Sequence, residues 1–363
     1  MQKGKNILIC PLEWGLGHAG RMIPVASELL AAGNNVFIGS GDEHLSFFRN
    51  EIEGLKYIRF PGFLIRYSRW LPQYLVIFLK TPSFIFHTIK EHRQLKQIIR
   101  DYSIDIVISD SRLGLWNRNV KTVIVTHMMR LPHPKWFRFL ENTGHSLTRR
   151  LLSKFSFCYI PDLPGEYNLS GKLSHNIDIP SNVRFIGILS RFAKEYLLTE
   201  TYFKRYFCTV ILSGPEPQRT ILKQKMTDIL SLSEKQSIML EGKPGEKKSI
   251  VGKGTIIFIN HAPAKEMGRI ILESEHIVTR SGYTTLMELV SLGKSALIIP
   301  TPGQSEQEYL AEYLGEKGWF STLSQHNLKA GIKLPSSDSK WPDGLIQESS
   351  RLMAEALREL LED

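Results

Sequence analysis

The sequence predicts an α/β protein built from two doubly wound domains, each with a parallel sheet between layers of helices. Its 363 residues are long for one hydrophobic core, which favours two domains. Short apolar runs such as Asn6–Cys10 and Cys208–Leu212 are typical of strands buried on both faces of a parallel sheet. These runs alternate with segments of helical periodicity, the pattern of βαβ units.

Composition narrows the class of protein. Apolar residues make up 42% of the chain and charged residues 23%, as in ordinary soluble globular proteins. No apolar run approaches the roughly 20 residues that span a bilayer, and the first residues lead directly into a strand without room for a signal peptide. Cys10, Cys158 and Cys208 have no metal-binding spacing, so we expect reduced thiols and a cytoplasmic protein.

The first domain is expected to begin with a strand, a glycine-rich loop and a helix from about Met22 to Ala32. Residues 63–100 are expected to be helical, with breaks near Pro72 and Pro82. The further strands expected in this domain are Asn35–Gly39, Ile104–Ser109, Lys121–Thr126, Cys158–Ile160 and Arg184–Ile186.

The second domain is expected to contain the stretch with the most chemistry. A strand at His276–Thr279 precedes a helix from Tyr283 to Leu292, which Gly293 ends, and a second strand follows at Ala296–Ile299. Thr255–Ile259 is a further strand, another helix runs to Lys317, and the tail Gly344–Leu361 has helical periodicity. Ligands of open α/β sheets bind at the carboxyl ends of such strands.

The residues after these strands suit an anionic ligand that carries a sugar ring. Backbone N–H groups of Ser281–Thr284 open a helix and favour phosphate. Glu288 is placed to accept hydrogen bonds from ribose hydroxyls, and Gln307 and Glu308 from the next helix are expected at the same pocket. Each residue alone also fits an ordinary cap or a solvated helix position, so the inference depends on their combination.

The first loop allows a rival interpretation. Gly15, Gly17 and Gly20 satisfy the G-x-G-x-x-G dinucleotide fingerprint, and Asp42 lies near the place of an acidic ribose ligand. Against an NAD(P) enzyme, four residues separate the strand from the first glycine. Asp42 lies beyond the end of the second strand, and this interpretation leaves the residues around Glu288 unexplained.

The positive charge of the chain is concentrated in one segment. Between Pro61 and Phe155 there are 16 Lys and Arg but 5 Asp and Glu, within a chain of net charge +10. The segment also holds the aromatic residues Phe63, Tyr67, Trp70, Tyr74, Phe78, Phe84 and Phe86. Such a mixture suits nucleic acid, an anionic membrane surface, or a core lined by solvated helices. No RNA-binding motif is present. A membrane is favoured over nucleic acid as the partner of residues 63–155 because the family resemblance described next implies acceptors that are often lipid-linked.

Arg280-Ser281-Gly282, Glu288, the proline-rich loop and Gln307-Glu308-Tyr309 together resemble the donor region of family 28 glycosyltransferases. Their best-known member is the peptidoglycan N-acetylglucosaminyltransferase that acts on lipid intermediates. The resemblance implies the GT-B fold: two Rossmann-like domains facing across a cleft, residues 1–188 for the acceptor and 189–342 for the nucleotide sugar. The last helix, 343–363, would return to the first domain.

The activity implied by the resemblance is inverting transfer of a sugar from a nucleotide diphosphosugar, UDP-linked, to a hydroxyl acceptor that is lipid-linked or an envelope polysaccharide. No cofactor is implied, and no Asp-x-Asp is present to hold a metal ion. An enzyme of this kind would be cytoplasmic, with a peripheral position on the inner membrane face.

The resemblance also assigns roles to residues. His18 would be the general base, with Asp110 orienting or replacing it. The acceptor would meet Gly15, Gly17, Arg21 and His127. The donor would meet Arg191, Ser213, Gly214, Ala264, Arg280, Ser281, Gly282, Thr284, Glu288, Gln304, Gln307 and Glu308. The alternatives are a sugar-nucleotide 2-epimerase, a nucleotide-binding protein without catalysis, and the NAD(P) enzyme.

Overall fold

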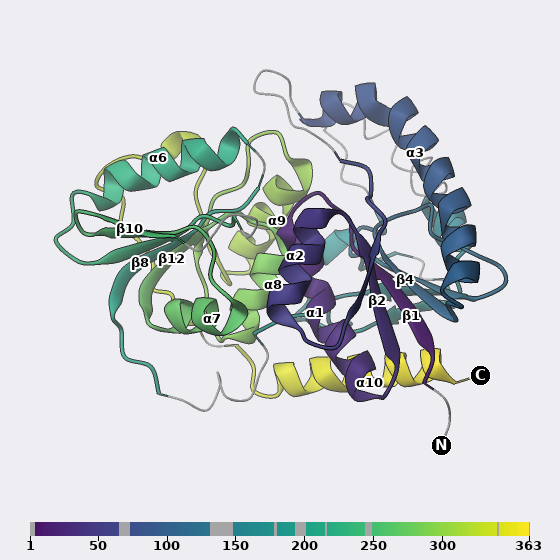
Figure 1. The fold of residues 1–363 in the computed structure, drawn as a ribbon. Helices are drawn as coiled ribbons and strands as arrows, with labels where there is room; N and C mark the ends of the chain where they lie inside the picture. The colour runs from purple at the N-terminus through teal and green to yellow at the C-terminus, as the bar shows by residue number, and fades with distance from the viewer. Residues whose placement is uncertain are drawn as a thin grey trace. The chain divides into compact units, whose positions relative to one another are not determined.

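The computed structural model describes residues 4–64, 73–130, 148–177, 180–192, 201–214, 216–243, 249–339 and 341–362. The chain divides into two compact units. The first unit comprises Met1–Ile65, Ile77–Leu189 and Gly344–Asp363, and the second comprises Arg66–Val76 and Ser190–Asp343. Each unit contains one sheet between helices (Figure 1), so the predicted α/β class is confirmed.

The first unit is built on a seven-stranded sheet in the order β3-β2-β1-β4-β5-β6-β7, in which every pair is parallel. Its strands are β1 (Asn6–Cys10), β2 (Asn35–Ser40), β3 (Lys56–Arg59), β4 (Ile106–Asp110), β5 (Lys121–Val125), β6 (Phe157–Ile160) and β7 (Val183–Phe185). Its helices are α1 (Leu16–Ala31), α2 (Asp42–Glu51), α3 (Gln73–Asp101) and α10 (Leu345–Leu361), with a short 3₁₀ turn at Gly171–Leu173.

Two helices of this unit differ from the prediction. Helix α1 begins at Leu16, six residues before the expected Met22, so the glycine-rich motif lies mostly inside the helix and not in a loop. Gly15 precedes it with φ of 142°, a conformation that a residue with a side chain rarely adopts. Helix α3 continues through Pro82, so the break expected there is wrong, whereas Pro72 lies outside the described residues.

The α3 helix packs one face on the sheet, where Leu95 joins a buried cluster with Leu8 and Val107. This tertiary packing stabilises the helix despite the interior proline. Among the residues that the model describes, no helix is long and apolar enough to cross a membrane.

The last helix, α10, belongs to the first unit, as the predicted fold requires. The Tyr159 hydroxyl donates to the Ala356 carbonyl at 2.7 Å, and Arg184 pairs with Glu359 at 2.7 Å. At the end of the helix, Lys5 donates to the Leu361 carbonyl at 2.6 Å, where a cation also complements the helix dipole. Lys5 precedes β1, so the C-terminus of α10 lies at the amino edge of the sheet.

The second unit is built on another seven-stranded sheet, in the order β10-β11-β9-β8-β12-β13-β14. Its strands are β8 (Tyr206–Ile211), β9 (Ser237–Leu240), β10 (Ile250–Lys253), β11 (Ile256–Ile259), β12 (Ser274–Thr279), β13 (Leu297–Ile298) and β14 (Ser321–Thr322). Its helices are α6 (Gln218–Leu230), α7 (Ala264–Leu272), α8 (Tyr283–Ser291) and α9 (Ser305–Glu316), with a 3₁₀ turn at Gln325–Asn327. The hairpin of β10 with β11 is antiparallel, and the other pairs are parallel.

Both sheets reverse their strand order near the middle. In the first unit the reversal lies between β1 and β4, and in the second between β8 and β12. Neighbouring loops diverge at such a point and leave room for a ligand at the carboxyl edge. The chemistry of each unit is therefore expected in the loops after these two pairs of strands.

Candidate functional site

His18 and Asp110 meet at the switch point of the first unit. Asp110 is the last residue of β4, and His18 lies in the first turn of α1, which follows β1. His18 Nδ1 lies 2.9 Å from Asp110 Oδ2. The His18 side chain is 22% exposed, whereas Asp110 is fully buried. The His18 side chain can thus reach a ligand, whereas the Asp110 side chain is held inside the protein.

Arg21, one turn further along α1, provides the counter-charge for Asp110. Its Nε lies 3.1 Å from both carboxylate oxygens, and its Nη2 also donates to Oδ1. Burial by itself would raise the pKa of Asp110, but the charge of Arg21 and the hydrogen bonds from His18 and Arg21 outweigh it and lower the pKa to about 2. Asp110 is therefore an anion at neutral pH.

An anionic Asp110 decides which nitrogen of His18 carries the proton. A carboxylate can only accept, so the Nδ1 atom at 2.9 Å must be the N–H donor. Arg21 Nη2 also lies 3.0 Å from Nδ1, but the Asp110 contact is the shorter of the two and directs the Nδ1 proton to the carboxylate. The second ring nitrogen of His18, Nε2, is then left with a lone pair that can accept a proton.

Burial bears on two of the residues expected around the acceptor. Asp110, expected to orient His18 or replace it as base, is fully buried, which favours the orienting role. Arg21 is 1% exposed, and its guanidinium is occupied by Asp110 and approaches His127 Nδ1 at 3.4 Å. Direct binding of an acceptor by Arg21 does not fit this burial. His127 follows β5 at the same sheet edge and is 4% exposed.

The glycine motif is placed differently from a dinucleotide fingerprint. Gly15 caps α1, Gly17 lies in its first turn, and Asp42 is an exposed residue of α2 that pairs with Arg59. At the end of β2, where a dinucleotide enzyme binds ribose, the Glu13 carboxylate instead accepts hydrogen bonds from protein groups. Glu13 was not predicted from the sequence, because the residues around it in the chain do not indicate the distant groups that it contacts.

In the second unit, the expected donor residues follow adjacent strands. Ser213 and Gly214 follow β8, Arg280–Gly282 follow β12, and Gln304 follows β13. Strands β8, β12 and β13 are neighbours in the sheet, so these turns share one edge. Gly282 caps α8, and an added Cβ there would have no atom within 4 Å. Ala264 lies farther along the edge, after β11.

The polar side chains around α9 connect these turns. The Ser281 hydroxyl donates to the Gln307 carbonyl at 2.8 Å, and the Gln307 amide oxygen accepts from the Thr301 N–H at 2.9 Å. Glu308 accepts from the Gly303 N–H at 2.8 Å. Thr284 is buried in the first turn of α8. These bonds hold the loop after β13 against the start of α8.

Arg191 and Glu288 form a buried ion pair within the second unit. Arg191 Nε lies 2.8 Å from Glu288 Oε1, and the side chains are 10% and 6% exposed. Burial raises the pKa of Glu288, and Arg191 opposes this change. The two residues were expected to contact different parts of the donor, and the structure brings them together at one point.

Arg280 was expected to contact the donor, but its geometry points to a structural role. The side chain is fully buried. Its guanidinium donates to the carbonyls of Ile299, Pro300 and Gln218 and to Gln325 Oε1. Burial lowers the pKa of Arg280 to about 10, which leaves it charged at neutral pH. It joins the loops after β8, β12 and β13 from below.

Thr301 is a further polar residue of this edge that the sequence analysis missed. It is 4% exposed, and its Oγ1 has no hydrogen-bond partner among the described residues. Gly214 lies beside it, since an added Cβ at Gly214 would be 3.8 Å from that oxygen. Gln304 Oε1 is likewise buried without a partner in the part of the chain that the model describes.

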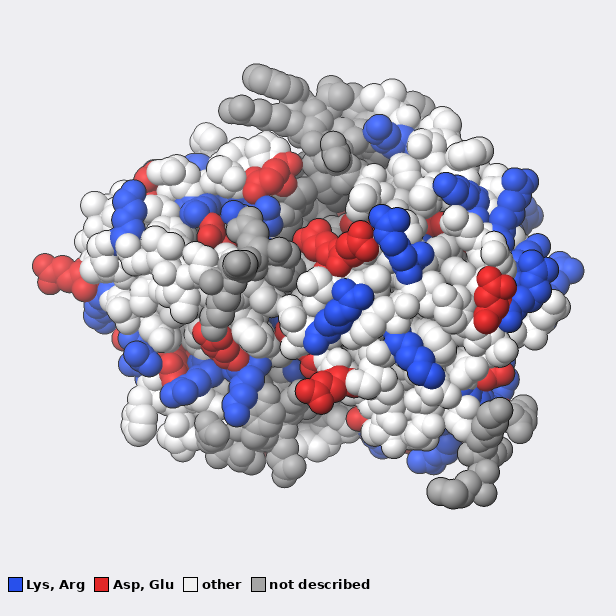
Figure 2. Space-filling view, in the orientation of Figure 1, with Lys and Arg blue, Asp and Glu red and all other residues white. Residues whose placement is uncertain are grey.

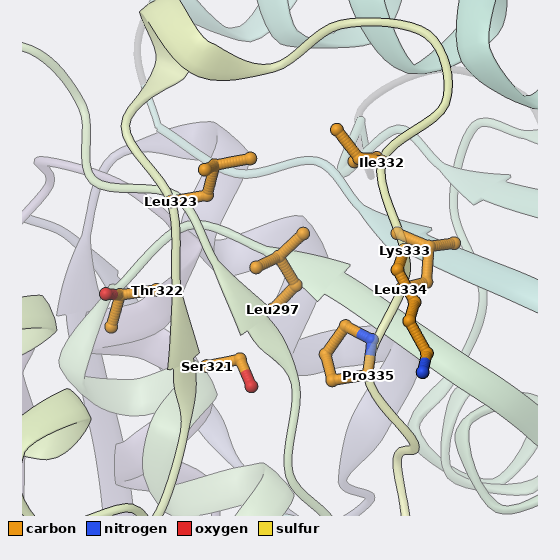
Figure 3. Close-up of a pocket in the computed structure, with 8 residues that line it drawn as sticks. All are labelled: Leu297, Ser321, Thr322, Leu323, Ile332, Lys333, Leu334 and Pro335. Carbon is orange, nitrogen blue, oxygen red and sulfur yellow. The ribbon is translucent and has the colours of Figure 1, made fainter.

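A pocket of about 540 Å³ lies elsewhere in the second unit, near the short edge strand β14. Figure 3 shows its lining, in which Leu297 and Leu323 come from the sheet side and Ile332 and Leu334 from the segment opposite. It contains none of the expected donor residues, and a largely apolar lining does not suit a diphosphate. Among the described residues, no group of three or more His, Cys, Asp or Glu side chains is placed to hold a metal ion.

The comparisons with known proteins agree with this architecture. Residues 220–338 match the model of the glycosyltransferase family 28 C-terminal domain. An uncharacterized glycosyltransferase of Methanosarcina mazei is 24% identical over 98% of both chains. The solved glycotransferase of kitacinnamycin has a TM-score of 0.61 at 13% identity, covering 99% of this chain and 94% of that one. MurG of Acinetobacter baumannii has a TM-score of 0.52 at 12% identity, covering 98% and 92%.

The family match falls on the second unit, where the expected donor residues lie, and the structural matches extend over both units. The chain therefore has the GT-B fold, and residues 220–338 of its second unit are similar to the C-terminal domain of family 28 glycosyltransferases.

Proposed function

We propose that the protein transfers a sugar, with inversion, from a UDP-linked donor to a hydroxyl of its acceptor, and that His18 is the general base. The observation that carries the proposal is the contact of His18 Nδ1 with the buried Asp110 carboxylate at 2.9 Å. It leaves Nε2 free to take the proton from the attacking hydroxyl. Asp110 then stabilises the imidazolium that forms.

The second unit supplies the donor site in this proposal. The N-terminus of α8, which follows β12 at the carboxyl edge, presents a positive dipole end to the diphosphate, whose charge grows as it leaves. The Ser213–Gly214 turn follows the neighbouring strand. The Arg191–Glu288 pair combines a cation that suits phosphate with a carboxylate that suits ribose hydroxyls. A departing diphosphate stabilised in this way needs no bound metal ion.

Nucleotide binding tests the donor site. UDP, GDP, dTDP, NAD and NADP are added separately, and the shift of Tm is measured for the wild type and for Glu288→Gln. A nucleotide at 100 times its Kd adds about 2.7 kcal/mol, which raises Tm measurably. We expect a shift with UDP that Glu288→Gln reduces. The exposed residue Glu312 of α9 provides the matched control, Glu312→Gln.

A shift with NAD alone would refute the proposal and would favour the dinucleotide interpretation of the first loop. Consumption of the UDP-sugar without any acceptor, to give a free 2-epimeric product, would favour the epimerase.

A membrane is the proposed location of the acceptor, because α3 carries an exposed face that is both apolar and basic. Leu79, Ile85, Phe86 and Ile89 are 62%, 54%, 72% and 48% exposed. Lys80, Lys90 and Arg93 are exposed on the same helix. Figure 2 shows Lys and Arg side chains along the side of the molecule where α3 lies in Figure 1. Apolar side chains flanked by cations suit an interface with anionic lipid.

Vesicle sedimentation tests this surface. We expect binding to vesicles that contain phosphatidylglycerol, weaker binding in high salt, and none to pure phosphatidylcholine. Phe86→Ser should reduce binding about 30-fold, since burying an aromatic side chain is worth about 2 kcal/mol. Phe203 of the second unit is 83% exposed, so Phe203→Ser is the matched control. Equal binding of the two variants would contradict a role for α3.

A further inference from the structure

The loop between β1 and α1 is tied to the ends of two other strands by one carboxylate. Glu13 Oε1 accepts from the Gly41 N–H at 2.8 Å, the Gly62 N–H at 2.7 Å and the Ser40 hydroxyl at 3.1 Å. Ser40 ends β2, and Gly62 follows β3, so a single oxygen connects three segments of the carboxyl edge. Three converging donors are typical of the strong hydrogen bonds that a charged acceptor makes.

The glycine at position 41 is required by this contact. A Cβ added at Gly41 would lie 2.6 Å from Glu13 Oε2, closer than real Cβ contacts allow. Any side chain at this position would displace the carboxylate or the start of α2. The close approach of backbone and carboxylate thus fixes the distance between the first loop and β2.

The next residue of the loop makes a second connection. Trp14 Nε1 donates to the Phe63 carbonyl at 2.8 Å. The Trp14 ring contacts the Phe84 ring of α3 edge-on, with 6.5 Å between the ring centroids. Phe63 contacts the same Phe84 ring, with 5.6 Å between the centroids. Glu13 and Trp14 together attach the loop to the chain after β3, so the start of α1 is held from two sides.

The groups near Glu13 do not include a histidine cation at neutral pH. His44, in the first turn of α2, is 4% exposed, and its Nδ1 has no hydrogen-bond partner among the described residues. Burial lowers the pKa of His44 to about 4, although the charge of Glu13 acts in the opposite direction. His44 is therefore neutral, and the N–H groups of Gly41 and Gly62 together with the Ser40 hydroxyl hold the Glu13 carboxylate.

His18 lies in the first turn of the helix that this loop begins. Helix α1 starts at Leu16, three residues after Glu13. Gly15 lies between Glu13 and Leu16, and glycine has more backbone freedom than any other residue type. The start of α1 therefore needs contacts outside the helix to define its position. We propose that Glu13 is a positioning residue for catalysis: by fixing the loop before α1, it holds the His18 ring in contact with Asp110. This inference rests on the proposed role of His18 as general base.

The state of the His18 ring tests the proposal without any substrate. In ¹⁵N NMR spectra of the histidine side chains, the His18 signals are identified by their loss in His18→Gln. We expect the wild type to show an Nδ1–H tautomer with an unprotonated Nε2, and Glu13→Ala to show a mixture of tautomers. Glu13→Gln, which retains an oxygen acceptor, should lie between them. Glu43→Gln, at an exposed position of α2, is the control.

Kinetics then separate positioning from other effects. Misplacing a catalytic group by about 1 Å lowers the rate on the order of 100-fold, so we expect Glu13→Ala to lower kcat by about 10- to 100-fold. The KM for the donor and the UDP-induced shift of Tm should not change. In a His18→Ala background, adding Glu13→Ala should cause little further loss, because the residue acts through His18.

Two results would overturn the inference. One is an unchanged His18 tautomer in Glu13→Ala, and the other is an equal loss of kcat from Glu13→Ala with and without His18. Failure of the proposed function would differ from both, since kcat would then be insensitive to His18→Ala itself.

Discussion

Replacing His18 with alanine is expected to lower kcat by about 10²- to 10⁴-fold, the usual contribution of a general base. In the proposed mechanism the imidazole takes the proton of the attacking hydroxyl, while its Nδ1 is held 2.9 Å from Asp110 and 3.0 Å from Arg21 Nη2. The donor KM and the UDP-induced Tm shift should be unchanged, because the donor residues lie in the second unit. Steady-state kinetics with sugars linked to the nucleotide that the binding screen selects measure kcat and the donor KM, and thermal unfolding measures the Tm shift.

The control for this variant is another partly buried histidine of the first unit. His92 Nδ1 donates to the Gly114 carbonyl at 3.1 Å, and the ring stacks on Trp116 at 4.2 Å, so its contacts are structural. His92→Ala should lower Tm with little effect on kcat. A His18→Ala enzyme with wild-type kcat would show that the proton leaves by another route.

Replacing Asp110 with asparagine is expected to impair both stability and catalysis. The variant leaves the buried Arg21 cation without its partner, which typically costs about 3–5 kcal/mol in the free energy of unfolding. The asparagine can also present its NH₂ group to His18 and favour the wrong tautomer, so kcat should fall by about 10³-fold or more. Urea unfolding and steady-state kinetics measure the two effects.

The same carboxylate makes the stability of the wild type depend on pH. The pKa of Asp110 is lowered from 3.8 to about 2 on folding, so the unfolded chain binds its proton at the higher pH. The resulting stabilisation is complete above pH 4 and is lost as the pH falls toward 2. From a shift of this size it amounts to roughly 2 kcal/mol. In Asp110→Asn, the free energy of unfolding should not show this loss between pH 4 and pH 2.

The exposed residue Asp42 supplies the control, because its pair with Arg59 is almost fully in solvent. Asp42→Asn should unfold like the wild type, as exposed ion pairs contribute little. If Asp110→Asn were as stable as Asp42→Asn, the ion pair with Arg21 would not hold the start of α1 in place.

Local sequence was sufficient to predict most strands and the α/β class. Runs such as Asn6–Cys10 are apolar at every position because both faces of the strand are covered, and they need no distant partner to be recognised. Helix α8 and its end near Gly293 were predicted for the same reason, since capping preferences act within a few residues. Helix α3 was mispredicted at Pro82 because packing against the sheet outweighs the local cost of a proline.

The site depends on contacts that no local pattern contains. The sequence by itself determined that His18 and Asp110 follow strands of one sheet, since each comes just after an apolar run. Only the tertiary structure decided that Arg21 neutralises Asp110 across 89 positions, that Glu13 accepts from Gly62 across 49, and that Arg191 pairs with Glu288 across 97. The physical reason is that a buried charge is stable only beside a partner, and the order of strands in the sheet, not the neighbouring sequence, selects that partner.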